Sequence, residues 1–195
     1  MATTATPMGA EPVDTLSASG SFTGKVRHIK IANAYGTAIF YGDFVKIVAA
    51  GTVEKAAVTT SVVAGTVGIF MGCSYTDPNT NQLTFNQQFI ASTAADDIVA
   101  YVCDDPKLLF RMQGDEAIAQ TGLGNNISAV NTAGSTSIGR SKNALDGGSI
   151  ATTNTLPLRV VDFVDGPSSA VGDAFTDCIV TYLPLSHAYE TKLGV

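Results

Sequence analysis

Short runs rich in β-branched and aromatic residues recur along most of the chain, and turn residues separate them. The runs cover residues 25–31, 37–41, 44–48, 53–57, 66–75, 82–90, 97–103, 108–113, 158–164 and 177–183. Such side chains favour strands over helices, and strands at near-regular spacing are typical of sandwiches and barrels. The sequence therefore predicts a mainly β protein, an antiparallel β-barrel or β-sandwich.

Two long segments lack this pattern. Residues 1–21 are small and polar, contain prolines and show no periodicity, which predicts an extended N-terminal arm. Residues 114–154 are rich in Gly, Asn, Ser and Thr, with sparse apolar anchors. Because a long structureless loop is unusual inside a compact domain, this segment is predicted to be a loop-rich excursion or a small subdomain.

The predicted organisation has five parts. They are the extended arm at 1–21, the first part of the β-domain at 22–113, the Gly/Ser/Thr-rich excursion at 114–154, the closing strands at 155–183 and an extended C-terminal tail at 184–195. The tail carries apolar and aromatic residues without the periodicity of a core element, so we expect both ends to lie on partners. The expected partner-binding residues are Pro7, Met8, Pro12, Val13 and Leu16 in the arm and Leu185, His187, Tyr189 and Leu193 in the tail.

Composition narrows the partner classes. The net charge is −6 and the pI is about 4.7, which opposes sequence-independent binding to nucleic acid. Charged residues make up 14% of the chain, against about 25% in typical soluble domains, as suits packed sheets and permanent interfaces. The N-terminus has no signal-peptide pattern and no window approaches eighteen continuous apolar residues, so we expect a soluble protein made in a cytoplasm, with no membrane partner.

The residues that could carry catalysis are few. His28 lies in a predicted strand between basic residues, and His187 lies in the tail, with no G-x-S-x-G motif for either to serve. Gly122-Leu-Gly124 lacks the third glycine of a dinucleotide fingerprint, and no Walker sequence is present. The sequence therefore predicts a protein that is not an enzyme and has no cofactor.

Acidic and sulfur-containing residues have structural explanations. The pairs Asp96-Asp97 and Asp104-Asp105 could serve Ca²⁺ or glycoside hydrolysis, but their positions favour a role in turns, so no metal site is predicted. Cys73, Cys103 and Cys178 each lie in an apolar run, which predicts buried free thiols. Core packing is expected to explain the aromatic residues, Phe85 among them.

Several blocks of the sequence resemble a known family. They are Tyr41–Ile47, Gly68–Thr76, Asp97–Gln113, Leu158–Pro167 and the ending from His187 to Val195. Their order is similar to that of head decoration, or cement, proteins of tailed bacteriophages.

This resemblance implies a non-enzymatic virion structural protein, made in the host cytoplasm and placed on the outer surface of the capsid. It also implies that the protein binds the major capsid protein across adjacent capsomers and itself as a homotrimer. The alternative is a carbohydrate-binding β-domain on a virion or cell surface, presented by the loop after Gly114. The chain has no tryptophan, so a host-surface glycan is the less favoured partner.

Overall fold

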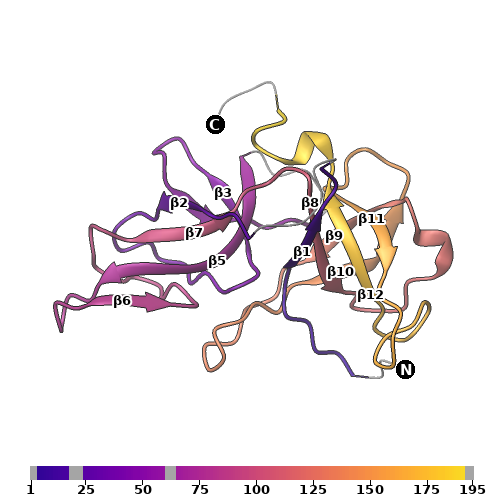
Figure 1. Cartoon of the computed structure of the whole chain (residues 1–195), viewed down its shortest axis with the longest axis horizontal. Coiled ribbons are helices and arrows are strands. Elements are labelled where there is room, and N and C mark those ends of the chain that lie inside the picture. Colours follow the sequence, from indigo (N-terminus) through magenta and orange to yellow (C-terminus); the bar gives the residue numbers. More distant parts are fainter. Residues whose placement is uncertain (1–3, 18–23, 60–64, 192–195) are drawn as a thin grey trace.

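The computed structural model describes residues 4–17, 24–59 and 65–191. In these ranges the chain forms strands β1 to β12 and two short 3₁₀-helices, η1 (Gln120–Gly122) and η2 (Pro184–Ser186). The strands form two antiparallel sheets, A and B, which lie side by side in Figure 1. The prediction of a mainly β protein is confirmed, and two open sheets fit a sandwich-like arrangement. Neither 3₁₀-helix has the length and apolar character needed to cross a membrane, nor does any other helix of the described ranges.

Sheet B is built around its longest strand. It contains β2 (Arg27–Lys30), β3 (Phe44–Ile47), β4 (Val53–Lys55), β5 (Thr66–Thr76), β6 (Leu83–Asn86) and β7 (Val99–Cys103). The order is β2-β7-β5-β3-β4, and β6 pairs with the second half of β5. Strand β5 is central because its sequence is almost continuously apolar and buried, as expected of a strand covered on both faces.

Sheet A combines the start of the chain with its second half. It contains β1 (Glu11–Thr15), β8 (Leu108–Gln113), β9 (Asn126–Val130), β10 (Ala144–Ala151), β11 (Leu158–Phe163) and β12 (Asp177–Tyr182). The order is β1-β8-β12-β11-β9-β10, so β1 and β10 are its edges. The chain thus crosses from sheet A to sheet B after β1 and returns between β7 and β8.

Three aromatic rings join the two sheets into one core. Phe44 of sheet B lies 5.7 Å from Phe110 and 6.1 Å from Tyr182, both of sheet A, measured between ring centroids. All three side chains are almost fully buried. Within sheet B, Gly68 on β5 allows the close approach of β7, because a Cβ there would lie 2.1 Å from the carbonyl oxygen of Cys103.

Two predicted irregular segments contain strands. Residues 11–15 of the predicted arm pair with β8, and Ala10 is fully buried in the shared core. Residues 114–154 supply β9 and β10 to sheet A, with Ile127 and Leu145 fully buried. The structure therefore adds strands to the predicted extended arm and to the predicted excursion, where the sequence analysis had placed none. Their small polar residues obscured short strands that are stabilised by pairing with distant parts of the chain. The run at 37–41, predicted as a strand, makes only isolated bridges.

Candidate partner-binding surfaces

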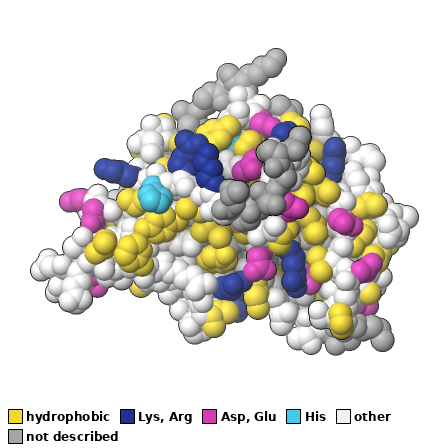
Figure 2. Space-filling view, in the orientation of Figure 1, with side chains coloured by type: hydrophobic (Ala, Val, Ile, Leu, Met, Phe, Trp, Pro, Cys, Tyr) yellow, Lys and Arg dark blue, Asp and Glu magenta, His cyan; other side chains and the backbone are white. Residues whose placement is uncertain are grey.

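An exposed apolar surface covers one face of β6 and β7. Leu83 and Phe85 project from the same side of β6, as alternate residues do in a strand, and are 63% and 68% exposed. The Phe85 ring stacks against Tyr101 of β7 at 6.4 Å, and Tyr101 contacts His28 of β2 at 4.7 Å. We call these four residues the Phe85 surface. Figure 2 shows hydrophobic side chains gathered over this part of sheet B.

The Phe85 surface differs from the expectation that core packing explains the aromatic residues. Phe44, Phe70, Phe89 and Phe110 are fully buried, as predicted, whereas Phe85 is mostly exposed. Leu83 and Phe85 project from a face of β6 that the described residues leave largely uncovered. The alternation of Leu83-Thr-Phe-Asn86 could have indicated a half-exposed strand.

A shallow groove of about 290 Å³ lies beside Phe85. It is lined by Tyr41, Met71, Gly72, Cys73, Phe85, Asn86, Gln87 and Tyr101. Aromatic faces next to side-chain amides can bind an apolar side chain or the face of a sugar ring.

The predicted arm residues lie along the edge of sheet A. Met8, Val13 and Leu16 are 49%, 42% and 50% exposed, and Pro7 and Pro12 are half-buried. Val13 falls where the β1–β8 register shifts between Pro12 and Asp14. The backbone of this segment is fixed by pairing, while its large apolar side chains remain in solvent.

A second cavity, of about 330 Å³, lies between the N-terminal segment and strands β8 and β12. Arg111 and Asp177 line it and form an ion pair with an N–O distance of 2.8 Å. The Thr6 amide donates to the side-chain oxygen of Gln113 at 2.7 Å, which holds the segment over the cavity. Because the cationic group is already paired with a carboxylate, the cavity lacks the free charge of an anion site.

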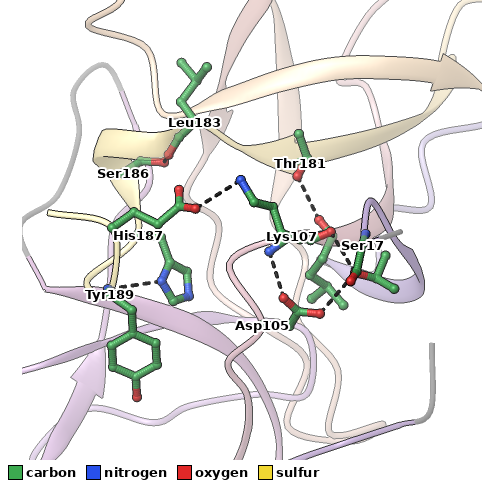
Figure 3. Close-up of polar contacts among 11 residues, drawn as sticks. Ser17, Asp105, Lys107, Thr181, Leu183, Ser186, His187 and Tyr189 are labelled. Atoms are coloured by element: carbon green, nitrogen blue, oxygen red, sulfur yellow. Dashed lines mark hydrogen bonds and ion pairs between the residues drawn. The ribbon is translucent and has the colours of Figure 1, made fainter. Parts of the chain in front are cut away.

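The C-terminal segment lies on the chain's own sheets (Figure 3). The amide of Ala188 donates to the Thr66 carbonyl at 2.6 Å, and Lys107 pairs with Glu190 at 3.1 Å. His187 is fully buried, 5.3 Å from the Tyr182 ring, and its Nδ1 accepts from the Tyr189 amide at 3.3 Å. Burial lowers the pKa of His187 below its ordinary value. The structure thus assigns His187 to the interior, which corrects its expected role as a contact residue.

The other predicted tail residues have mixed outcomes. Tyr189 is 46% exposed and lies under the Arg27 guanidinium, 5.4 Å from the ring centroid. The side chain of Leu185 and all of Leu193 lie outside the described part of the structure. The N-terminal and C-terminal segments both contact the turn between β7 and β8, which the sequence did not predict. Thr15 Oγ1 donates to Asp105 at 3.1 Å, and Glu190 pairs with Lys107.

A buried polar network was missed by the sequence analysis. Asp43 is fully buried, and one of its oxygens lies 2.8 Å from Lys55 Nζ and accepts from the Phe40 amide at 2.9 Å. The other oxygen accepts from Ser141 Oγ at 2.6 Å and from Asn143 Nδ2 at 3.1 Å. Such a fully satisfied network fixes 141–143 against sheet B, and its four donors leave little capacity for catalysis.

Among the acidic pairs predicted to form turns, only Asp105 has a local turn contact within the described residues, whereas Asp96, Asp97 and Asp104 contact the distant residues Asn33, Thr76 and Arg27. Asp105 accepts from the Lys107 amide at 2.8 Å, and Asp97 accepts from the Thr76 amide and hydroxyl. One grouping was not expected: carboxylate oxygens of Asp115, Glu116 and Asp146 lie within 4.8 Å of one another, on a largely exposed surface. Exposure and the absence of a rigid, buried ligand among them leave this cluster as a solvated acidic face.

The three cysteines are buried free thiols, which confirms the prediction. Burial raises the pKa of Cys73 and of Cys178 to about 12 and that of Cys103 to about 11. Thiols with such pKa values stay protonated near neutral pH and are poor nucleophiles.

Comparisons with protein-family models, curated proteins and solved structures returned no match for this chain.

Proposed function

We propose that this protein is a non-enzymatic virion structural protein that decorates the outer surface of a phage capsid. In this proposal it binds the major capsid protein across adjacent capsomers and so cements the shell. The sequence resemblance supplies the family, and the exposed apolar residues of the N-terminal segment supply a surface for the contact.

The observation that carries the proposal is the exposure of Val13 on the edge strand β1, and of Met8 and Leu16 in the segments that flank it. Because the backbone that carries these side chains is already ordered, a partner that covers them causes little further loss of backbone entropy. An edge strand also offers unpaired backbone groups to a neighbouring chain. Pro12, which cannot donate a backbone hydrogen bond, limits indiscriminate pairing along this edge.

Preferential binding to the closed shell explains how a decoration protein can stabilise a capsid. A protein that binds only the closed, assembled shell stabilises that state and shifts the equilibrium away from opening. Many copies on one shell make this effect cumulative, so each contact can be weak.

Co-sedimentation with phage heads that lack this protein tests the proposal. The full chain is expected to pellet with the heads, and the double variant Val13→Ser, Leu16→Ser is expected to bind at least tenfold more weakly. Leu123→Ser is the matched control, because Leu123 is 44% exposed on η1's C-terminal side, away from β1. A full chain that stays in the supernatant would refute the proposed function.

The resemblance also implies a homotrimer, and this remains a prediction that the mass of the purified protein decides.

A carbohydrate-binding domain is the second candidate, and the groove beside Phe85 favours it. Phe85 and Tyr101 offer ring faces, and Asn86 and Gln87 offer amides, in the combination that binds sugars. This location differs from the loop after Gly114 expected from the sequence. Saturation-transfer NMR with a panel of mono- and oligosaccharides tests it: no transfer from any sugar at millimolar concentration would exclude this candidate.

A further inference from the structure

His187 anchors the C-terminal segment His187–Thr191, and its two ring nitrogens have different surroundings (Figure 3). Nδ1 accepts a hydrogen bond from the amide of Tyr189 at 3.3 Å. Nε2 is buried and has no hydrogen-bond partner of normal geometry among the described residues. Because Nδ1 acts as an acceptor, the proton of the neutral ring lies on Nε2.

We infer that protonation of His187 releases the segment His187–Thr191 from the two sheets, so that this segment is docked at neutral pH and released in mildly acidic solution. The imidazolium carries a donor on both nitrogens, so a proton on Nδ1 would face the N–H of Tyr189 and remove the hydrogen bond between them. The charged ring would also be buried without the water that normally hydrates it. The inference concerns contacts within one chain and stands independently of the proposed function.

The other described contacts of the segment are suited to release. The Ala188 amide donates to the Thr66 carbonyl of β5 at 2.6 Å. The ion pair between Lys107 and Glu190 is partly exposed, and such pairs contribute little to stability. The residue before the segment is held more firmly, because the Ser186 hydroxyl is buried and donates to the Pro157 carbonyl at 2.7 Å. Release is therefore expected to stop at η2.

The carboxylates that act on the buried ring already have partners of their own. Asp104, in the turn after β7, pairs with Arg27 of β2. Asp105, in the same turn, accepts from the Lys107 amide at 2.8 Å. Glu190, in the segment itself, pairs with the Lys107 ammonium at 3.1 Å. These pairings leave the carboxylates partly neutralised as partners for an imidazolium.

The balance of these effects gives the direction of the switch. Burial lowers the pKa of His187 below its ordinary value, and this effect exceeds the opposing effects of the Val67 backbone and the three carboxylates. The phenols of Tyr182 and Tyr189 stay neutral in this pH range, because burial raises the pKa of both. Once released, the ring regains an ordinary pKa of about 6.5. The ratio of docked to released segment should therefore fall by up to about tenfold for each pH unit below 6.5.

Amide hydrogen exchange of the full chain, followed by NMR, tests the inference. Dividing the intrinsic exchange rate by the measured rate at the same pH gives a protection factor that can be compared between pH values. The protection factors of the Ala188 and Tyr189 amides are expected to fall severalfold, by at most about tenfold, between pH 7.5 and pH 5.5, whereas those of β5 and β12 should not change.

Two variants identify the group that titrates. His187→Asn keeps an acceptor oxygen near the place of Nδ1 and cannot be protonated, so its protection factors should not depend on pH. His28→Asn is the matched control, because it removes the other histidine, which is exposed on β2, and it should behave as the wild type does.

A measurement on the wild type remains decisive if His187→Asn fails to dock its C-terminal segment. The NMR shifts of the two imidazole nitrogens report which one carries the proton, and at pH 7.5 Nδ1 is expected to be unprotonated. A proton on Nδ1 at that pH would overturn the inference, because Nδ1 could then not accept from Tyr189.

Three results of the exchange experiment would also overturn the inference. The first is a protection factor for the Tyr189 amide that is the same at both pH values. The second is a pH dependence that His187→Asn keeps or that His28→Asn removes. The third is an equal fall for the amides of β5 and β12, which would show that acid destabilises the whole domain and does not release the segment alone.

Discussion

The Asp43–Lys55 ion pair belongs to the network that fixes residues 141–143 against sheet B, and its contribution to the free energy of unfolding can be measured. Lys55→Met keeps the length and most of the apolar volume of the side chain but removes the cation 2.8 Å from a fully buried carboxylate. Three neutral donors remain, from Phe40, Ser141 and Asn143. Removing one partner of a buried ion pair costs about 3–5 kcal/mol, because the other charge is left uncompensated.

That loss is a large part of the roughly 5–15 kcal/mol that stabilises a typical domain. With a urea m-value of about 2 kcal/mol/M, the unfolding midpoint should fall by about 2 M. Equilibrium urea unfolding, followed by circular dichroism, measures the change, and Lys30→Met on exposed β2 is the control, with an expected change of less than about 0.5 kcal/mol. A loss below about 1 kcal/mol with an unchanged m-value would refute the reasoning, since the neutral donors alone would then hold the carboxylate.

Three further predictions concern groups that titrate or could bind ions. Because burial lowers the pKa of His187, the native state binds fewer protons than the unfolded state below pH 6.5, so the free energy of unfolding should fall as pH drops from 7 towards 5. His187→Gln should weaken this pH dependence, whereas His28→Gln, at an exposed position, should not. Equal pH profiles of the unfolding free energy for wild type and His187→Gln would contradict the buried position of His187. The native protein should react negligibly with an aromatic disulfide reagent at pH 8, whereas all three thiols should react in 6 M guanidinium; fast labelling of the native state would show that the thiols open readily. EDTA should leave the melting temperature unchanged, because the Asp115, Glu116 and Asp146 cluster is largely exposed, and a fall of several degrees would reveal a structural cation.

The strands with the densest apolar runs could be predicted from the sequence. The runs at 66–75, 108–113 and 177–183 became β5, β8 and β12, which occupy central places in the two sheets. Their dense runs of β-branched and aromatic residues favour a strand locally, so the runs can be identified without knowledge of the partner strands.

The strands that sequence reasoning missed depend on distant partners. Strand β1 contains a proline and two acidic residues and is stable because β8, about a hundred residues away, pairs with it. Strand β10 contains two adjacent glycines and pairs with β9 through an irregular register. Local propensity opposes a strand in both segments, so only tertiary pairing could decide their structure.

The exposure of individual side chains also depends on tertiary packing that the sequence does not reveal. Composition indicated an assembly protein with contacts at its ends, yet the tail residue His187 is buried because Tyr182 and Tyr189 enclose it. Composition did not indicate the Phe85 surface, because an aromatic residue in a strand is usually buried; the alternation of apolar and polar residues from Leu83 to Asn86 was the available signal.

The structure changes what deletion of the N-terminal segment should do. The sequence predicts that loss of residues 1–16 leaves the domain folded and weakens capsid binding alone. In the structure this deletion removes β1 and the buried Ala10, and it exposes the edge of β8, which carries Leu108 and Phe110 of the core. An unpaired apolar edge promotes association between chains.

We therefore expect the truncated protein to have a lower melting temperature and to aggregate, as light scattering would detect during a thermal ramp. The double variant Val13→Ser, Leu16→Ser keeps the backbone pairing of β1 and changes only exposed side chains, so it should stay monodisperse with a nearly unchanged melting temperature. Fold and partner binding can then be separated by these substitutions and not by the deletion. A truncated protein as stable and soluble as the full chain would mean that β1 contributes little to sheet A, and the segment would again be a free arm.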